Sequence, residues 1–222
     1  MTVTAILPVP TSLESRREAV FSPVAGLSPL ARIVRSLAAA ADVIVAAAAP
    51  LVDEVKTSLA AQGLSGTRVC VADDPGVPTN CIAAALRVPG VAEQVLLHDI
   101  AWPLVSPVTL ARVMDALRDG AAAVLPVCPV TDSIKAVDSN GTVTATVERT
   151  PLRTVQYPRG FSAAVLSRLL THDGAVELDA VLASGVPVTY VDGDTDAMAV
   201  ELPGDASYLA AVIEGRSDGS GC

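Results

Sequence analysis

Lysine is nearly absent from this chain. Only Lys56 and Lys135 are lysines among 222 residues, and the formal net charge is −9 at pH 7. Such a surface repels nucleic-acid backbones and anionic membranes, so we expect no nucleic-acid partner and no membrane partner. A site for phosphate groups would therefore depend mainly on arginines, on backbone N–H groups or on a metal ion.

The cysteine patterns of zinc sites and disulfide frameworks are also missing. The four cysteines show no Cys-x-x-Cys spacing, and the chain has only two histidines, which argues against both kinds of site. No apolar run approaches the roughly 20 residues of a membrane-spanning helix, and no charged-then-apolar leader precedes the first predicted strand. We therefore expect a cytoplasmic protein.

Apolar residues, mostly alanine and valine, make up 51% of the chain, and in the first 127 residues they recur in a regular order. Apolar runs predict buried strands over residues 3–10, 42–47, 68–72, 94–97 and 121–127. Amphipathic segments predict helices over residues 30–37, 50–61, 80–88 and 107–118, with a loop over 11–25. Ser28, Thr79 or Asn80, and Ser106 are the expected N-caps. This alternation predicts an α/β fold, with a three-layer, mostly parallel, Rossmann-like sheet and helices on both faces.

The alternation breaks after residue 127. Two strand-like runs over residues 133–137 and 143–147 flank an Asn140-Gly141 pair, which is a strong signal for a β-hairpin. Because no helix follows, we expect an arm of about residues 131–158 that projects from the body. It is either a dimer contact or a plain surface hairpin.

The last part of the chain is predicted to complete one domain over residues 1–214. Helices are expected over 162–170, 178–183 and 205–214, and strands over 186–191 and 198–202. The tail over 215–222 is expected to be disordered.

One predicted strand ends in His98-Asp99. Ligands of parallel α/β sheets bind outside the carboxyl ends of the strands, where a carboxylate suits a metal–phosphate group or a sugar hydroxyl. The alternative is that Asp99 only caps the following turn, as many aspartates do after a strand.

Five short motifs occur in order along the chain. They are Gly26-Leu27-Ser28-Pro29-Leu30, His98-Asp99-Ile100-Ala101-Trp102-Pro103, Pro126-Val127 with Thr131-Asp132-Ser133-Ile134-Lys135, Thr146-Val147-Glu148-Arg149, and Val200-Glu201-Leu202-Pro203-Gly204-Asp205. Together they resemble the motifs of the 2-C-methyl-D-erythritol 4-phosphate cytidylyltransferases, and more broadly of the nucleotide-sugar-type nucleotidyltransferases.

This resemblance implies a transferase of isoprenoid biosynthesis that moves CMP from CTP, or from another nucleotide, to a sugar or polyol phosphate. It implies a homodimer through the arm and Mg²⁺ held by Asp99 and Asp196. It also implies two further sets of site residues. The catalytic set is Arg16 (or Arg17), Asp132, Lys135 and Arg149, with Arg149 reaching the partner subunit's site, and the nucleotide-binding set is Pro8, Val9, Asn80, Cys81, His98 and Trp102.

Several positions depart from the family's pattern. The glycine-rich phosphate loop is replaced by Val9-Pro10-Thr11-Ser12-Leu13-Glu14-Ser15-Arg16, the two family lysines fall on Val20 and Ala199, and a family arginine falls on Trp102. The alternative is therefore a pseudoenzyme that binds a phosphorylated metabolite or a protein partner without turnover.

For several single residues, an interpretation without a functional role also stays open. Lys135 could be a solvated hairpin charge, and Arg149 could pair with Glu148 or Asp132. Asp196 could belong to an exposed acidic turn, and Trp102 could cover an apolar rim.

Overall fold

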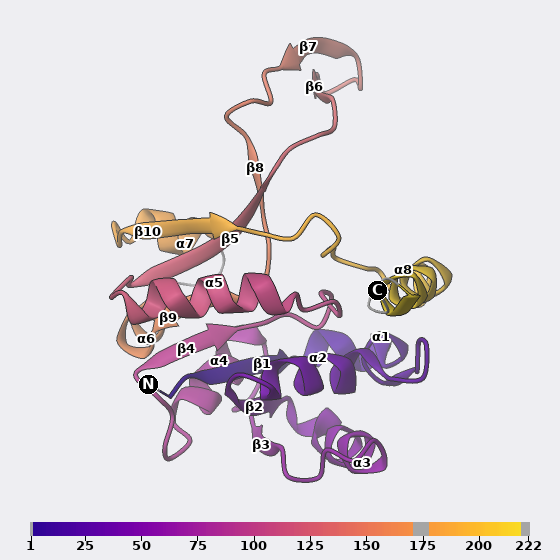
Figure 1. Cartoon of the computed structure of the whole chain (residues 1–222), viewed down its shortest axis with the longest axis vertical. Helices are drawn as coiled ribbons and strands as arrows, with labels where there is room; N and C mark the ends of the chain where they lie inside the picture. The colour runs from indigo at the N-terminus through magenta and orange to yellow at the C-terminus, as the bar shows by residue number, and fades with distance from the viewer. Residues whose placement is uncertain (1, 171–177, 219–222) are drawn as a thin grey trace.

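The computed structural model describes residues 2–170 and 178–218, and these fold around a mostly parallel sheet (Figure 1). Eight strands form this sheet in the order β10-β5-β9-β4-β1-β2-β3, with β8 paired to β5. The strands are β1 (Thr4–Val9), β2 (Asp42–Ala47), β3 (Arg68–Val71), β4 (Gln94–Leu97), β5 (Ala123–Pro129), β8 (Arg153–Val155), β9 (Arg159–Ser162) and β10 (Val188–Asp192). The predicted α/β class and mostly parallel sheet are confirmed.

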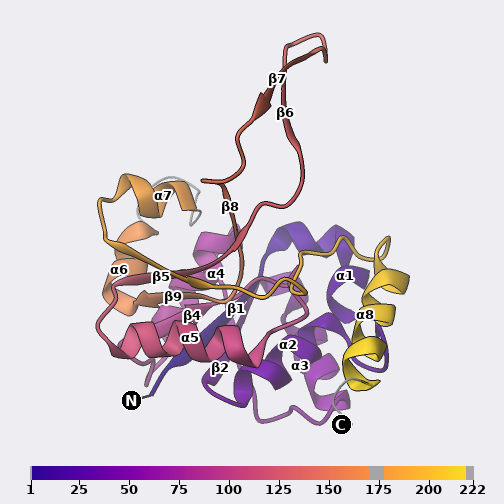
Figure 2. The same ribbon diagram turned by 45° about the horizontal axis from the view of Figure 1, so that its top comes forward.

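Helices cover both faces of the sheet, as Figure 2 shows. The main helices are α2 (Pro29–Ala38), α3 (Val52–Ala61), α4 (Pro78–Leu86), α5 (Pro107–Arg118), α6 (Ala163–Leu169), α7 (Leu178–Ala183) and α8 (Ala206–Asp218). Buried residues of α2, α3 and α5 share one core cluster with Ala5, Leu7 and Val9 of β1, whereas those of α4, α6 and α7 share another with Ile6. Strands buried on both faces read as continuous apolar runs, which is why the sequence located them.

The order of the strands reverses beside β1. The chain runs outward from β1 through β2 to β3, all in parallel, and then returns to place β4 parallel to β1 on its other side. In open α/β sheets, ligands bind outside the carboxyl ends of the strands at such a switch point. The switch point between β1 and β4 is also where His98 and Asp99 follow β4.

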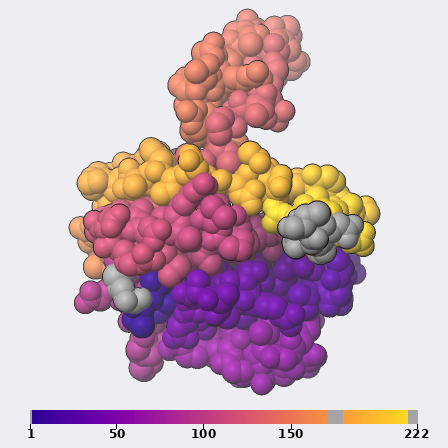
Figure 3. All heavy atoms as spheres, viewed as in Figure 1, coloured from indigo at the N-terminus to yellow at the C-terminus, as the bar shows by residue number. Residues whose placement is uncertain are grey.

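The predicted hairpin forms and stands away from the body (Figure 3). Its strands are β6 (Ile134–Val137) and β7 (Val143–Val147), which pair only with each other among the described residues. The expected arm of residues 131–158 is too long, however, because β8 pairs with β5 in the main sheet. The projecting part therefore ends before Arg153.

Several predicted elements need correction. The strand predicted over 198–202 does not form, since Val200 and Leu202 pack with α8 in a third apolar cluster. The loop predicted over 11–25 contains the 3-10 helix η1 (Thr11–Arg16) and the short helix α1 (Glu18–Phe21). Strands β8 and β9 were not predicted. Helix α8 continues to Asp218, so the first four residues of the predicted disordered tail are helical, and the rest of the tail lies outside the described residues.

The predicted helix caps are mostly correct. Ser28 accepts a hydrogen bond from Ala31 N–H at 3.2 Å, and Ser106 accepts one from Thr109 N–H at 3.4 Å. Helix α4 differs, because it begins at Pro78 and leaves Asn80 in its first turn. None of the described helices has both the length and the apolar character that crossing a bilayer requires.

Candidate functional site

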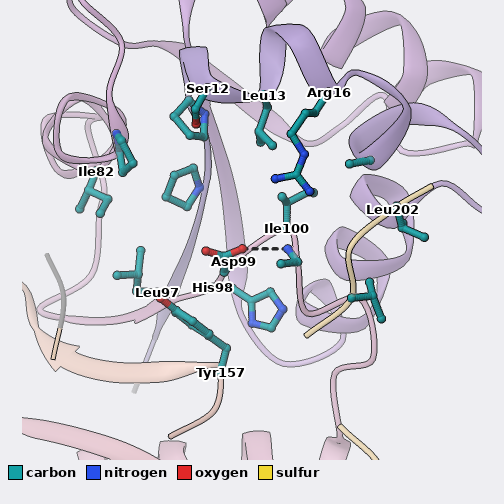
Figure 4. A pocket seen from close by; sticks show the side chains of 16 residues that line it. Ser12, Leu13, Arg16, Ile82, Leu97, His98, Asp99, Ile100, Tyr157 and Leu202 are labelled. Carbon is teal, nitrogen blue, oxygen red and sulfur yellow. Dashed lines mark hydrogen bonds between the residues drawn. The ribbon is translucent and has the colours of Figure 1, made fainter. Parts of the chain in front are cut away.

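A cavity of about 330 Å³ opens at the carboxyl ends of β1 and β4 (Figure 4). Its walls come from β1 and the segment after it, from the start of α4, from residues 97–101, from Tyr157 and from the segment that contains Val200 and Leu202. These pieces are far apart in the sequence and meet at the switch point between β1 and β4. The cavity is therefore the place where this fold is expected to bind a ligand.

Asp99 presents its carboxylate to this cavity. One oxygen, Oδ1, accepts a hydrogen bond from Ala101 N–H at 2.8 Å, and the Asp99 carbonyl accepts one from Trp102 N–H at 3.0 Å. Asp99 thus caps the turn after β4 with one oxygen, as one interpretation of the sequence expected. No described protein group donates to its second oxygen, which leaves that oxygen for a ligand.

His98 is buried in the floor of the cavity and supports the turn. Its Nε2 lies 2.8 Å from the carbonyl oxygen of Trp102. Because a carbonyl only accepts, Nε2 must carry the proton. Burial lowers the pKa of His98 to about 4, so the imidazole is neutral at physiological pH. His98 lines the cavity, but its one hydrogen bond in the described structure goes to the protein backbone.

The segment after β1 forms the 3-10 helix η1, and hydrogen bonds attach its first residue to the turn before α4. The N–H of Thr11 donates to the Gly76 carbonyl at 2.9 Å, and the Thr11 hydroxyl donates to the Pro75 carbonyl at 2.6 Å. Gly76 has φ +71°, and a Cβ there would lie 2.6 Å from Thr11 Oγ1 and 2.8 Å from Ala48 Cβ. Only glycine fits, so the turn before α4 closes tightly on this segment.

Two neighbouring arginines on this segment have different surroundings. Arg16 points into the cavity, and within the described part of the chain it has no ion-pair or hydrogen-bond partner. Arg17 is outside the cavity walls and pairs with Glu14 and Glu54. Of the two candidates, the structure therefore brings only Arg16 to the site.

The other predicted nucleotide-binding residues divide into two groups. Pro8 lines the cavity, whereas Val9 and Cys81 are fully buried beneath its walls. Burial raises the pKa of the Cys81 thiol to about 12, so it is neutral. Asn80 accepts a hydrogen bond from Val77 N–H at 3.2 Å and closes the first turn of α4. The side chains of Val9 and Cys81 therefore do not face the cavity, and the side-chain oxygen of Asn80 is used within α4.

An aromatic and cationic cluster surrounds Tyr157, which lines the cavity. The ring of Tyr157 meets the edge of His98 at 5.9 Å and the ring of Trp102 at 6.1 Å, measured between centroids. The guanidinium of Arg159 lies 4.2 Å from the Tyr157 centroid, a cation–π contact. Tyr157 lines the cavity, whereas Trp102 and Arg159 contact its ring without being part of the described wall.

The predicted sugar-phosphate residues lie on the arm and do not reach this cavity within one chain. Lys135 Nζ donates to Thr146 Oγ1 at 2.8 Å across the hairpin, and Arg149 donates to the Thr131 carbonyl. Among the described contacts, Arg149 therefore forms no ion pair with Glu148 or with Asp132. Asp132 is exposed.

Asp196 lies in an exposed turn that Gln156 holds in place. The buried amide of Gln156 donates to the carbonyls of Asp194 and Ala197 at 2.8 and 2.9 Å, and accepts from Asp194 N–H at 2.9 Å. Gly193 is required beside it, because a Cβ would lie 2.1 Å from Gln156 Oε1. Asp196 is not part of the cavity wall.

The fit of these groups to Mg²⁺ depends on a phosphate ligand. Within residues 2–170 and 178–218 no three His, Cys, Asp or Glu side chains gather as a metal-binding group. Magnesium is nevertheless usually held by one or two carboxylates together with substrate phosphates and water. The free oxygen of Asp99 fits that role, and the exposed position of Asp196 leaves its contribution a prediction.

Sequence reasoning missed several residues of the cavity wall. Leu13, Ile82 and Tyr157 line it, although none of them was among the predicted site residues. Apolar residues in irregular segments give no periodic signal. The available signals were the place of Leu13 within the segment that replaces the phosphate loop, and the place of Tyr157 before Pro158-Arg159, where the family has Thr-Pro-Gln.

Comparisons with known proteins agree with the resemblance. A family model described as 2-C-methyl-D-erythritol 4-phosphate cytidylyltransferase matches residues 11–214. A protein of that name from Rhodococcus jostii (strain RHA1) is 37% identical over 208 residues, covering 91% of this chain and 89% of its own. Another from Frankia casuarinae is 38% identical over 199 residues, covering 87% and 73%. The crystal structure of the Thermus thermophilus protein of that name superposes with a TM-score of 0.75 at 26% identity, covering 96% and 100%.

Proposed function

Because the chain belongs to the 2-C-methyl-D-erythritol 4-phosphate cytidylyltransferase family, we propose that it transfers CMP from CTP to a sugar or polyol phosphate. The observation that carries the proposal is the Asp99 carboxylate in the cavity at the switch point between β1 and β4. The acceptor of the proteins named above is 2-C-methyl-D-erythritol 4-phosphate, which is the acceptor we propose here.

The proposed reaction is a displacement at phosphorus. A phosphate oxygen of the acceptor forms a bond to the α-phosphorus of CTP, and the bond from that phosphorus to the pyrophosphate oxygen breaks. Such chemistry depends on positioning the reactants and on neutralising the phosphate charge. Bound Mg²⁺ would supply part of that neutralisation. In this chain Asp99 would hold the metal through its free oxygen, and Arg16 would face the phosphates from η1.

We also propose that the active form is a homodimer in which the arm of one subunit reaches the cavity of the other. Lys135 lies on β6 and Arg149 follows β7, and this hairpin projects away from the body of its own chain (Figure 1). The arm also exposes Val137 and Val143, each by 59%, and a two-stranded hairpin is marginal when isolated. A partner subunit would cover these valines. Cytoplasmic location stays a prediction from the sequence.

The low positive charge of the cavity favours a second candidate function, in which the protein binds a nucleotide without catalysing transfer. Arg16 is the one lysine or arginine among the described residues of its wall. Removing a single well-placed donor from transition-state charge typically lowers a rate by about 10²–10³. A cavity with one cation would therefore bind a nucleotide more readily than it would catalyse transfer.

Pyrophosphate release from CTP and 2-C-methyl-D-erythritol 4-phosphate with Mg²⁺ tests the first candidate. We expect release that Asp99→Asn lowers by about 10²-fold or more and that Asp53→Asn, an exposed change on α3, leaves unchanged. Bound CTP with no release above background favours the second candidate instead. If folded protein binds neither CTP nor the acceptor, both candidates are wrong.

Mixing two inactive variants tests the shared site. Asp99→Asn removes the cavity carboxylate, and Arg149→Ala removes the arm cation. If each site uses Asp99 of one subunit and Arg149 of the other, equal mixtures that exchange subunits regain about a quarter of wild-type activity. If both residues act within one subunit, mixtures show no gain.

A further inference from the structure

The backbone after β1 has few free N–H groups that could bind a triphosphate. Phosphate loops hold their ligand with successive backbone N–H groups. Of the six residues from Pro8 to Leu13, four have no backbone N–H that is free to bind phosphate. The two prolines lack an N–H, Thr11 N–H donates to the Gly76 carbonyl, and Leu13 N–H donates to the Pro10 carbonyl at 3.0 Å. Opening this segment would break the contacts of Thr11 with Pro75 and Gly76.

Within one chain, the described side chains that line the cavity carry one charge of each sign. Arg16 is the cation, and Asp99, the anion, faces the same space. One guanidinium can hold one phosphate through paired hydrogen bonds, but it leaves the other phosphates of a triphosphate without a partner. An unpaired phosphate near a carboxylate is unfavourable in a partly enclosed space.

The rest of the wall suits the body of a nucleoside. Pro8, Leu13, Ile82 and the ring of Tyr157 offer apolar surface, which a flat base covers well and a small polyol does not. The free oxygen of Asp99 can accept a hydrogen bond from a ribose hydroxyl. A cavity of about 330 Å³ lies in the range of small-molecule sites.

We propose that this cavity selects a nucleoside monophosphate over the corresponding triphosphate. Three features support this: the single unpaired arginine of the described wall, the backbone N–H groups that already donate within the protein, and the apolar walls. Arg16 holds the phosphate, and the free oxygen of Asp99 accepts a hydrogen bond from the ribose, in place of the Mg²⁺ contact proposed for turnover. The inference rests on the nucleotide site of the proposed function and specifies its ligand. It also favours binding without turnover, since the preferred nucleotide then has no pyrophosphate to release.

Titration of the full-length protein with CMP, CTP and cytidine, each with and without Mg²⁺, tests this selectivity. Calorimetry gives the affinities directly. Without Mg²⁺ we expect CMP to bind about tenfold or more tightly than CTP, because CTP adds charge without adding partners. We expect the same order with Mg²⁺, because the ribose occupies the free oxygen of Asp99 that a metal would need. CTP binding as tightly as CMP, or more tightly, overturns the inference, as does the absence of CMP binding.

Two matched variants test the role of Arg16. Arg16→Gln should lower the affinity for CMP about tenfold and leave the affinity for cytidine unchanged, because only CMP carries the phosphate. Arg17→Gln removes the same charge from the next residue, outside the cavity, and should change neither affinity. Equal weakening by both variants would show a general charge effect and overturn the assigned contact. Pyrophosphate release and the order of affinities are separate measurements, so either proposal can fail alone.

Discussion

Gln156 is expected to be the main support of the turn that carries Asp196. Its amide makes three hydrogen bonds to the backbone of residues 194 and 197, and its side chain is 4% exposed. The variant Gln156→Met keeps a similar shape and removes all three bonds. At about 1 kcal/mol net for each bond, we expect a loss of about 3 kcal/mol in the free energy of unfolding.

Urea unfolding followed by the fluorescence of Trp102 measures this loss, since the chain has one tryptophan. Hydrogen exchange at Asp194 N–H measures the turn itself, and we expect its protection to fall with the global stability. Thr154→Val is the control, because it removes one longer bond, 3.3 Å, from an exposed residue of β8. We expect that variant to lie within about 0.5 kcal/mol of the wild type.

A second substitution approaches the same contact from the other side. Gly193→Ala would place a Cβ 2.1 Å from Gln156 Oε1 and force the amide away from the turn. We therefore expect it to lower both stability and the protection of Asp194. A Gln156→Met variant that lies within about 0.5 kcal/mol of the wild type, with Asp194 N–H still protected, would refute the assigned role of Gln156.

Three further predictions concern the walls of the cavity. Cys81 should resist a thiol reagent at neutral pH in folded protein and react on unfolding, because burial raises its pKa to about 12; modification at the rate of a free thiol would contradict this. Gly76→Ala should destabilise the protein by about 1–3 kcal/mol, measured by urea unfolding, since its Cβ would meet Thr11 and Ala48 and φ is positive. In metal-free buffer, the wild type should lose about 2 kcal/mol more stability between pH 7 and 5 than His98→Gln. Burial lowers the pKa of His98 to about 4, so over this range the unfolded chain binds a proton that the folded chain does not; parallel pH profiles would refute the assignment.

Local signals in the sequence were sufficient for the frame of the fold. Apolar runs located the parallel strands, and Ser28 and Ser106 marked the starts of two helices. The Asn140-Gly141 pair located the hairpin. These features were predictable because each depends on residues close in sequence, through periodicity, capping or turn geometry.

The insertion of an antiparallel strand between two parallel ones had no local signal. Strand β9 has four residues and pairs with both β4 and β5. Its Gly160 is needed because a Cβ would lie 2.8 Å from Val113 Cγ1 of α5. Conversely, the apolar residues at 198–202 predicted a strand, but their burial comes from α8 and not from a sheet.

The sequence by itself determined that a carboxylate follows β4 at the expected binding edge of an α/β sheet, and its motifs pointed to the family. The tertiary structure decided what surrounds Asp99. It brought Arg16 into the cavity and left Arg17 outside, and it kept Lys135 and Arg149 on the arm. It also showed that the N–H of Thr11 is already bonded to Gly76. These outcomes depend on contacts between residues far apart in the chain, which no local pattern encodes.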